Sequence, residues 1–315
     1  MARMSEVPVL LIGYNRPDKF TSLINSLRIS EPKTVLIAID GPKQNSQDDA
    51  FMVNATIETI ESIDWTKNIV SRISKQNLGL RQSISSAVSW ALSEYGECIV
   101  LEDDVVIGKE FIDYAKYSLD KYREARKIFQ INGYSQVPLK DLSKLSSNSR
   151  ISRYPSSCAW ATWNDRWNFY DDQMEWAKSV TLSDLKAIVG TNTGAVKWKL
   201  NFADALNHRI DSWATRWLAS IWSNDGYVIS PNRSLVEYRG RNSGTHTRTI
   251  PKWNEPSILD LPQAMPDVVN TYPVLDIKAE IWLKDNVYRE SVSGVIRGSV
   301  ASLLLEVIKL RNSIK

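Results

Sequence analysis

The sequence has few features of an exported or membrane-spanning protein. It contains only two cysteines, Cys98 and Cys158, which are too few for a disulfide framework and favour a reducing compartment. The first six residues (MARMSE) have no apolar signal core, and no run approaches the roughly 20 apolar residues that cross a bilayer. The net charge is only +3, with no Lys/Arg face interleaved with aromatic residues. We therefore expect a cytoplasmic protein that does not bind nucleic acid.

Tryptophan is the one residue type present in excess. The chain of 315 residues has 43% hydrophobic and 24% charged residues, as soluble globular proteins do, but it carries 12 tryptophans. Indole rings pack well on the faces of sugars, and they also fill protein cores. The count alone leaves both interpretations open.

The order of apolar segments predicts the fold class. Strands are expected at residues 7–13, 34–39, 98–101 and 128–132, with a weaker one at 69–73, and amphipathic helices lie between them. This alternation is typical of an α/β protein with an open sheet covered by helices. We expect a first half at 1–135, a Trp-rich second half at 136–250, and an extension at 251–315 that begins irregular and ends in an amphipathic helix.

Polar residues follow three of the predicted strands. They are Asn15 and Arg16, then Asp40, then the triplet 102–104 (Glu-Asp-Asp). In open α/β sheets, ligands bind beyond the carboxyl ends of the strands. A nucleotide diphosphate sugar would find there an acceptor for its base in Asp40, cations for phosphate in Arg16 and Arg81, and carboxylates for ribose and for Mg²⁺ or Mn²⁺.

Each of these residues also has a structural interpretation when taken alone. The triplet 102–104 suits the start of a helix, where Asp and Glu interact favourably with the free N–H groups. Residues 40–42 (Asp-Gly-Pro) are typical of a turn, and Arg81 could be a solvated helix residue. Their joint placement at successive strand ends favours a functional site.

The chain resembles the GT-A glycosyltransferases. The resemblance is to bacterial family-2-like enzymes and to the eukaryotic N-acetylglucosaminyltransferases that initiate complex N-glycans. It runs from about residue 7 to residue 247, through ordered blocks: 8–17 (PVLLIGYNRP), 37–41 (IAIDG), 77–81 (NLGLR), 99–104 (IVLEDD), 111–114 (FIDY), 156–163 (SSCAWATW), 211–213 (DSW) and 244–246 (GTH). It implies a GT-A fold, a Rossmann-like open mixed sheet flanked by helices, with a C-terminal helical extension.

The resemblance also implies roles in binding the donor and the metal. Asp104 would ligate Mn²⁺ or Mg²⁺, and His246 would complete the metal shell. Glu102 and Asp103 would reach ribose or metal-bound water. The other residues expected to line the donor pocket are Asn15, Arg16, Asp40, Asn77 and Arg81. The donor would be a nucleotide diphosphate sugar, with a UDP-sugar favoured.

Further roles implied by the resemblance lie in the second half. Asp211 would be the catalytic base, and Trp160 and Trp163 would contact the sugar or the acceptor. The chain departs from the family pattern in having Cys158-Ala159 where a glycine is common. Taken alone, Asp211 could instead cap the helix that follows it, and His246 could be an incidental loop residue.

Together these observations favour an inverting glycosyltransferase, with hexosyl or N-acetylhexosaminyl transfer to a glycan acceptor. The alternatives are a sugar nucleotidyltransferase, against which the single glycine after the first strand argues, and a non-catalytic carbohydrate-binding protein. The last residues carry an apolar stripe beside basic ones: Val292, Ile296, Val300, Leu303, Val307, Leu310 and Ile314. Such a helix either docks on the domain or a partner chain, or lies on an anionic membrane. The second alternative would place the protein at the inner face of the plasma membrane beside a lipid-linked acceptor.

Overall fold

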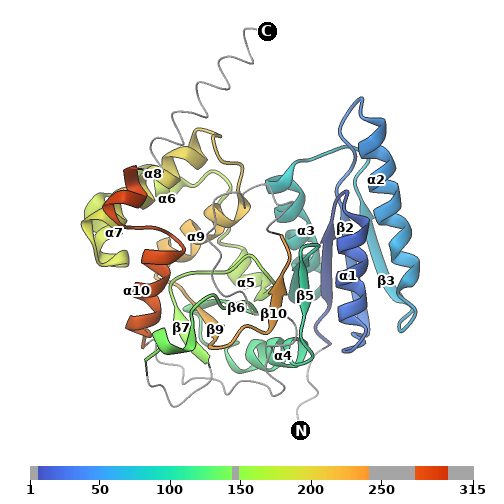
Figure 1. Cartoon of the computed structure of the whole chain (residues 1–315), viewed down its shortest axis with the longest axis horizontal. Helices are drawn as coiled ribbons and strands as arrows, with labels where there is room; N and C mark the ends of the chain where they lie inside the picture. The colour runs from blue at the N-terminus through green and yellow to red at the C-terminus, as the bar shows by residue number, and fades with distance from the viewer. Residues whose placement is uncertain (1–5, 144–148, 241–273, 297–315) are drawn as a thin grey trace.

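The computed structural model describes residues 6–143, 149–240 and 274–296. It is a mixed α/β structure whose eight-stranded open sheet has helices on both faces (Figure 1). The strand order is β3-β2-β1-β4-β8-β6-β9-β7, and a separate pair is formed by β5 and β10. The predicted fold class, an open mixed sheet flanked by helices, is confirmed.

The elements alternate along the chain as the apolar segments predict. The first are β1 (Val9–Gly13), α1 (Pro17–Leu27), β2 (Thr34–Ile39), α2 (Gln47–Glu58), η1 (Thr59–Ser62), β3 (Asn68–Ile73), α3 (Leu80–Tyr95), β4 (Glu97–Glu102), β5 (Val105–Ile107), α4 (Phe111–Lys121) and β6 (Ile128–Asn132). The rest are η2 (Leu139–Asp141), β7 (Ser149–Ser152), β8 (Trp160–Trp163), α5 (Asn164–Trp167), α6 (Glu175–Ser179), α7 (Leu182–Val189), α8 (Asn192–Leu206), α9 (Trp213–Ser223), β9 (Tyr227–Pro231), β10 (Val236–Tyr238) and α10 (Ile277–Asn286).

The strand directions create one functional edge. Strands β3, β2, β1 and β4 are parallel, β8 is antiparallel to both β4 and β6, and β9 is parallel to β6. Therefore β1, β2, β4, β6 and β9 all end at the same edge of the sheet. The antiparallel strands β7 and β8 begin there. The residues that follow β1, β2, β4, β6 and β9 therefore lie at the same edge as the residues that precede β7 and β8.

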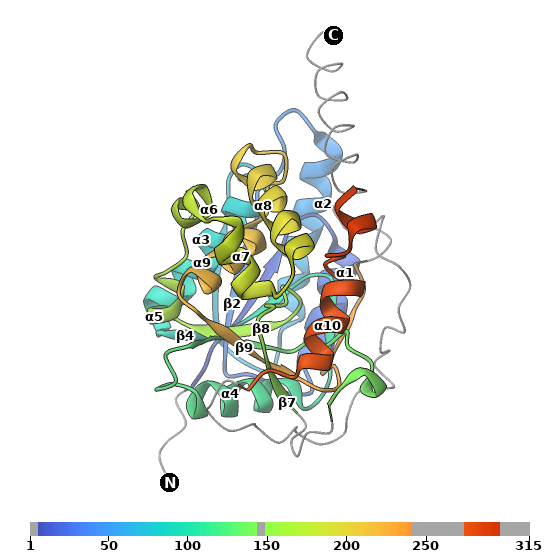
Figure 2. The same ribbon diagram turned by 90° about the vertical axis from the view of Figure 1, so that its left-hand side faces the viewer.

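The sheet separates two apolar layers. Strand residues alternate between the faces, so Leu10 of β1 packs with α3 and α9, whereas its neighbour Leu11 packs with α1 and α4. Strands β1, β2 and β4 are covered on both faces, which explains why they read as continuous apolar runs, whereas the edge strand β3 is mostly exposed. Helices α6, α7 and α8 group at one end of the molecule, around the Trp-rich layer (Figure 2).

Tryptophan mostly fills this layer. Trp160 stacks on Trp213 with ring centroids 5.2 Å apart, and Trp167 lies 4.8 Å from Trp217. All four rings are buried. Trp213 and Trp217 therefore fill the core, because their rings pack against other indoles.

The C-terminal extension is held on the sheet by buried carboxylates. Asp276 caps α10 and accepts hydrogen bonds from Ser143, while Glu280 accepts from Ser152 Oγ at 2.6 Å. Glu290 accepts from the Tyr154 hydroxyl and the Trp198 indole N–H, both at 2.7 Å. The α10 helix therefore lies against β7 and the Trp-rich layer as part of the fold. In the described ranges no helix has the length and apolarity needed to cross a membrane, and the predicted tail helix falls almost entirely outside them.

Glu290 makes the stability of this docking depend on pH. Its side chain is 3% exposed and burial raises its pKa, although the hydrogen bonds from Trp198 and Tyr154 oppose the rise. A carboxyl with a raised folded-state pKa stabilises the protein most below its unfolded pKa, near 4.3, and loses that contribution as pH rises through the folded-state pKa. In Glu290→Gln the amide oxygen still accepts both hydrogen bonds. We expect its free energy of unfolding, relative to the parent, to increase from pH 4.5 to pH 8.

Urea denaturation at pH steps across this range measures the difference. The expected size is about 1.4 kcal/mol for each unit by which the folded-state pKa exceeds the unfolded one. Glu61→Gln, on the exposed turn η1, removes the same charge from the surface and serves as the control. A parent–Glu290→Gln difference that stays constant with pH would contradict the burial of an ionisable carboxyl at this position.

Candidate functional site

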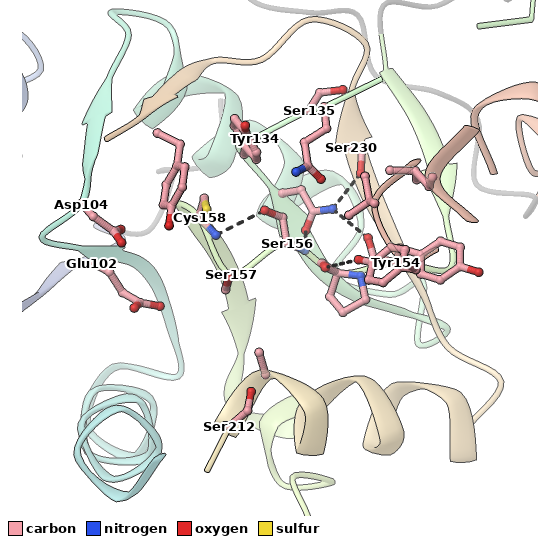
Figure 3. Close-up of a pocket in the computed structure, with 18 of the residues that line it drawn as sticks. Glu102, Asp104, Tyr134, Ser135, Tyr154, Ser156, Ser157, Cys158, Ser212 and Ser230 are labelled. Atoms are coloured by element: carbon pink, nitrogen blue, oxygen red, sulfur yellow. Dashed lines mark hydrogen bonds between the residues drawn. The ribbon is translucent and has the colours of Figure 1, made fainter. Parts of the chain in front are cut away.

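Two adjoining cavities lie along the functional edge of the sheet. The main cavity, of about 310 Å³, extends from the end of β4 to β7 and α10. The side cavity, of about 250 Å³, lies over the ends of β1 and β2. Arg16, Leu80 and Glu102 line both. Figure 3 shows the main cavity with Glu102 and Asp104 on one side and Ser230 and Tyr154 on the other.

The acidic triplet divides its side chains between two tasks. Asp103 is buried and forms a two-point ion pair with Arg16, with Nη2–Oδ1 at 2.6 Å and Nε–Oδ2 at 3.1 Å. Glu102 and Asp104 instead face the main cavity. Burial raises the pKa of Asp103 to about 7, against the lowering effect of Arg16. The pair holds the Arg16 guanidinium between the two cavities.

Glu102 and Asp104 form a site that suits a cation. Burial, and then the charges of Asp104 and Asp103, raise the pKa of Glu102 well above its usual value. Burial also raises the pKa of Asp104. The Oε1 atom of Glu102 is buried and has no hydrogen-bond partner. An unpartnered buried carboxylate oxygen is costly, and a divalent cation would offset that cost.

The described residues supply only part of a metal shell. No group of three or more His, Cys, Asp or Glu side chains is placed to hold a metal within 6–143, 149–240 and 274–296. At phosphate sites, Mg²⁺ or Mn²⁺ is commonly bound by one or two carboxylates, and substrate oxygens and water complete the shell. Glu102 and Asp104 would supply two such carboxylates. His246 lies outside the described residues, so its part in the shell stays a prediction.

Arg16 lines both cavities and keeps one donor group unpaired. Its Nε and Nη2 are used by Asp103, but its Nη1 is buried without a hydrogen-bond partner. A second cation, Lys43, lines the side cavity and was not identified from the sequence, although it directly follows the predicted turn 40–42. Arg16 and Lys43 therefore both bring positive charge to the side cavity.

Asp40 organises the loop that follows β3. Its carboxylate accepts from the backbone N–H groups of Gly41 and Leu78, both at 2.9 Å, from Gly79 N–H at 3.2 Å, and from Asn77 Nδ2 at 3.1 Å. Asp40 and Asn77 both line the side cavity. Because both carboxylate oxygens already accept bonds from the chain, Asp40 shapes the pocket wall. Its predicted contact with a nucleobase stays a prediction.

Asn15 is placed behind the pocket. Its Nδ2 donates to Asp49 Oδ1 at 2.6 Å, and Tyr14 donates its hydroxyl hydrogen to the other oxygen of the same carboxylate. Tyr14 lines the side cavity, whereas Asn15 does not. Burial, followed by the hydrogen bond to Asp49, raises the pKa of Tyr14, so the phenol stays protonated. Asn15 therefore helps to position Asp49, which in turn binds Tyr14 in the wall of the side cavity.

Arg81 connects the two halves of the chain. Its Nε lies 2.7 Å from Asp211 Oδ1, and its Nη1 pairs with Asp172. It does not line either cavity. Hydrogen bonding to Asp172 is the main cause that raises the pKa of Arg81. Arg81, which was predicted to bind phosphate, therefore binds the carboxylate of Asp211, the predicted base, in this structure.

Asp211 lies beside both cavities. Its side chain is 52% exposed. Its neighbours Ser212 and Trp213 line the main cavity, and its Oδ2 faces Gly79 of the side-cavity wall. The helix cap is Ser212, whose Oγ accepts from Thr215 N–H, so the capping interpretation of Asp211 is wrong. The Asp211 carboxylate therefore pairs with Arg81 and can also accept a hydrogen bond from a ligand.

Trp160 and Trp163 do not reach either cavity. Trp160 is enclosed by Trp167 and Trp213, and the Trp163 indole N–H donates to Leu119 O at 3.2 Å. Both side chains are buried in the core. This corrects the prediction that they contact sugar or acceptor: they begin and end β8, and its side chains point into the two apolar layers.

The loop before β8 supplies the floor of the main cavity. Asn132 fixes it by accepting from Ser156 N–H at 3.1 Å and donating to Tyr154 O at 3.3 Å. Ala159 has φ +50°, a left-handed conformation that favours glycine and costs about 1 kcal/mol or more for another residue. The departure from glycine seen in the sequence is therefore a strained position directly beside the cavity.

Comparison with known proteins gives only structural resemblances. No family model matches the chain, and no curated protein matches it. A mannosyltransferase from Pyrobaculum calidifontis, solved with GDP-Man and Mn²⁺, matches 71% of this chain and 75% of its own at 10% identity and a TM-score of 0.34. The bifunctional glycosyltransferase WbbM matches 57% and 36% at 10% identity and 0.32, and an apo UDP-glucose pyrophosphorylase 74% and 93% at 10% identity and 0.30. At 10% identity these resemblances concern the arrangement of the chain and assign no activity.

Proposed function

We propose that the chain is an inverting, metal-assisted glycosyltransferase that moves a hexosyl or N-acetylhexosaminyl group from a nucleotide diphosphate sugar to a glycan acceptor. The observation that supports it most is the position of Glu102 and Asp104. Both line the main cavity together with Arg16, and Glu102 Oε1 and Arg16 Nη1 are each buried without a hydrogen-bond partner. Carboxylates and a guanidinium arranged in this way suit a metal-bound diphosphate.

The donor would lie across both cavities. Its nucleoside would occupy the side cavity, between Tyr14, Lys43 and the loop 77–79 that Asp40 holds. Its diphosphate would lie at the shared wall, where Arg16 donates from Nη1 and stays in place through Asp103. When bound at Glu102 and Asp104, the cation would neutralise charge that develops on the departing diphosphate.

The transfer step would use Asp211 as general base. The acceptor oxygen forms a bond to the anomeric carbon while the bond from that carbon to the diphosphate oxygen breaks on the opposite side. The proton of the attacking hydroxyl passes to the Asp211 carboxylate, whose Oδ1 is oriented by Arg81. Arg16 stabilises the negative charge of the leaving diphosphate, and a single displacement inverts the anomeric configuration.

Metal-linked nucleotide binding tests this function. We expect UDP with Mn²⁺ to raise the melting temperature of the full chain, and UDP with EDTA to have little effect. Binding to the folded state alone adds about 2.7 kcal/mol of stability when the ligand is at a hundredfold excess over its Kd. Asp104→Asn should lose the metal-dependent part, whereas Asp113→Asn, on the exposed side of α4, should keep it. GDP in place of UDP tests the preference for a uridine nucleotide.

Two outcomes would reject the metal assignment: equal stabilisation with EDTA, and an unchanged response of Asp104→Asn. The products distinguish the other functions. A sugar nucleotidyltransferase would release pyrophosphate from a nucleoside triphosphate and a sugar 1-phosphate. A carbohydrate-binding protein would bind glycans with no response to nucleotide or metal. A transferase should release nucleoside diphosphate when an acceptor is present.

A further inference from the structure

Arg150 is a buried cation at the far end of the main cavity. It lies on the edge strand β7, is 2% exposed, and lines the cavity. Nη1 donates to Pro231 O at 2.7 Å and Nη2 to Ser135 Oγ at 3.1 Å, while Nε is buried without a partner. Both strong acceptors are neutral, and throughout the described ranges no carboxylate forms an ion pair with this guanidinium. A buried charge without a counter-ion is costly to keep.

The nearest acidic groups already have other partners. Glu280 accepts from Ser152 Oγ at 2.6 Å and from Arg153 N–H at 3.3 Å, and Asp276 is used by Ser143 and the start of α10. Both act on Arg150 only at longer range, and burial remains the dominant influence, which lowers the pKa of Arg150 to about 10. At neutral pH the guanidinium is still charged, so its charge remains available to the cavity.

Arg150 is distant from the proposed metal site. Asp104 follows β4 and Arg150 lies on β7, four strand positions further along the sheet. At about 4.8 Å per strand, the two strand axes are roughly 19 Å apart. This separation of the strands favours the acceptor, rather than the donor sugar, as the carrier of a group that reaches Arg150.

The surroundings of Arg150 suit an anionic oxygen group. Ser135 and Ser230 line the same end of the cavity, and Ser230 is the register partner of Arg150 on β9. Hydroxyl and guanidinium donors together bind carboxylate or phosphate well. Figure 3 shows Ser135 and Ser230 on the side of the cavity away from Glu102 and Asp104.

We propose that this end of the main cavity is a subsite for a negatively charged group, a carboxylate or a phosphate, carried by the glycan acceptor. The inference rests on the proposed glycosyltransferase function and adds the chemical class of its acceptor, an acidic glycan. Arg150 binds the anion, and the hydroxyls of Ser135 and Ser230 complete the site.

Ligand-observed NMR on the full chain with UDP and Mg²⁺, which is diamagnetic, tests the subsite directly. The probes are methyl glucuronide, its neutral counterpart methyl glucoside, and glucose 6-phosphate, which separates phosphate from carboxylate. We expect an anionic probe to bind about tenfold or more tightly than methyl glucoside, since hydrogen bonds to charged groups are the strong ones. Arg150→Gln should remove this preference, and Arg150→Lys should keep part of it. Equal binding of the three probes, or no binding of either anion, overturns the proposal.

Arg153→Gln is the matched control. Arg153 follows β7, lies over the Tyr227 ring and does not line the main cavity, so its loss removes one charge without touching the subsite. If Arg150→Gln does not fold, the comparison of the three probes on the parent and on Arg150→Lys still tests whether the subsite prefers an anion. A preference unchanged in Arg150→Lys and in Arg150→Gln contradicts the role of Arg150.

The same samples separate this inference from the function on which it rests. Normal UDP–Mn²⁺ stabilisation without anion preference rejects the subsite alone. An Arg150-dependent anion preference without metal-linked UDP binding keeps the subsite and rejects the glycosyltransferase. The ratio of the Kd of UDP-glucuronic acid to the Kd of UDP-glucose should be the same for the parent and for Arg150→Lys. A ratio that changes would place the anion on the donor sugar and overturn the acceptor assignment.

Discussion

Asp211→Asn is expected to fold and bind nucleotide as the parent does and to lose turnover by roughly 10²- to 10⁴-fold, the usual contribution of a positioned base. The amide cannot accept a proton, but it keeps an oxygen for Arg81. The start of α9 should not change, because Ser212 is its cap. Melting temperature, metal-linked UDP binding and initial rates at saturating donor and acceptor measure the three properties separately.

Asp172→Asn provides the matched control. Asp172 binds the same guanidinium as Asp211 but lines neither cavity. Loss of its charge should loosen Arg81 and reduce turnover far less than Asp211→Asn does. If both variants lose turnover equally, Asp211 acts only through Arg81, as a positioning residue. If Asp211→Asn stays within a few-fold of the parent, another group is the base.

Asp40→Asn is expected to lower the free energy of unfolding by about 2–4 kcal/mol, because hydrogen bonds to a charged acceptor contribute about 1.5–3 kcal/mol each. Each carboxylate oxygen accepts two hydrogen bonds: Oδ1 from Gly41 and Leu78, and Oδ2 from Gly79 and Asn77. An amide nitrogen in either position faces two donors and accepts from neither. The loop 77–79 should therefore loosen and weaken nucleotide binding as well.

Urea denaturation and UDP titration measure the two effects of Asp40→Asn. Asp48→Asn, on the exposed first turn of α2, removes the same charge without breaking a buried network. Burial raises the pKa of Asp40, against the backbone N–H groups of Leu78, Gly41 and Gly79. If desolvation of the charge outweighs these hydrogen bonds, Asp40→Asn will be as stable as the parent, and the loop-organising role will be rejected.

Strands β1, β2 and β4 are readable from the sequence because they are buried on both faces. Continuous apolar runs such as that of β1 identify such strands, and the polar residues directly after them mark the functional edge. Strands β7 and β8 carry no comparable pattern. Ser149, Arg150 and Ser152 are buried polar residues in a strand of four, and only pairing with β9 explains them.

The ion-pair partner of each charged side chain is the part of the site that the sequence predicts least. The strand ends predict that Arg16 and Asp40 follow neighbouring strands, but no sequence pattern predicts that Asp103 pairs with Arg16 or that Arg81 binds Asp211. Such pairs depend on side-chain contacts between residues as far as 130 positions apart. Arg150 was missed for the same reason, since a single arginine in a serine-rich segment reads as solvated surface.

The position of β8 also affects how the chain reaches its folded state. β8 joins two groups of strands that both pair with it, β4 on one side and β6 on the other, yet it is made after both. Until residues 160–163 arrive, the edges of β4 and β6 that will pair with β8 are unpaired, and β4 is strongly apolar. Unpaired apolar edges pair with other chains, and non-local sheets form slowly. The emerging chain is therefore most exposed to aggregation between the completion of β4 and the arrival of β8.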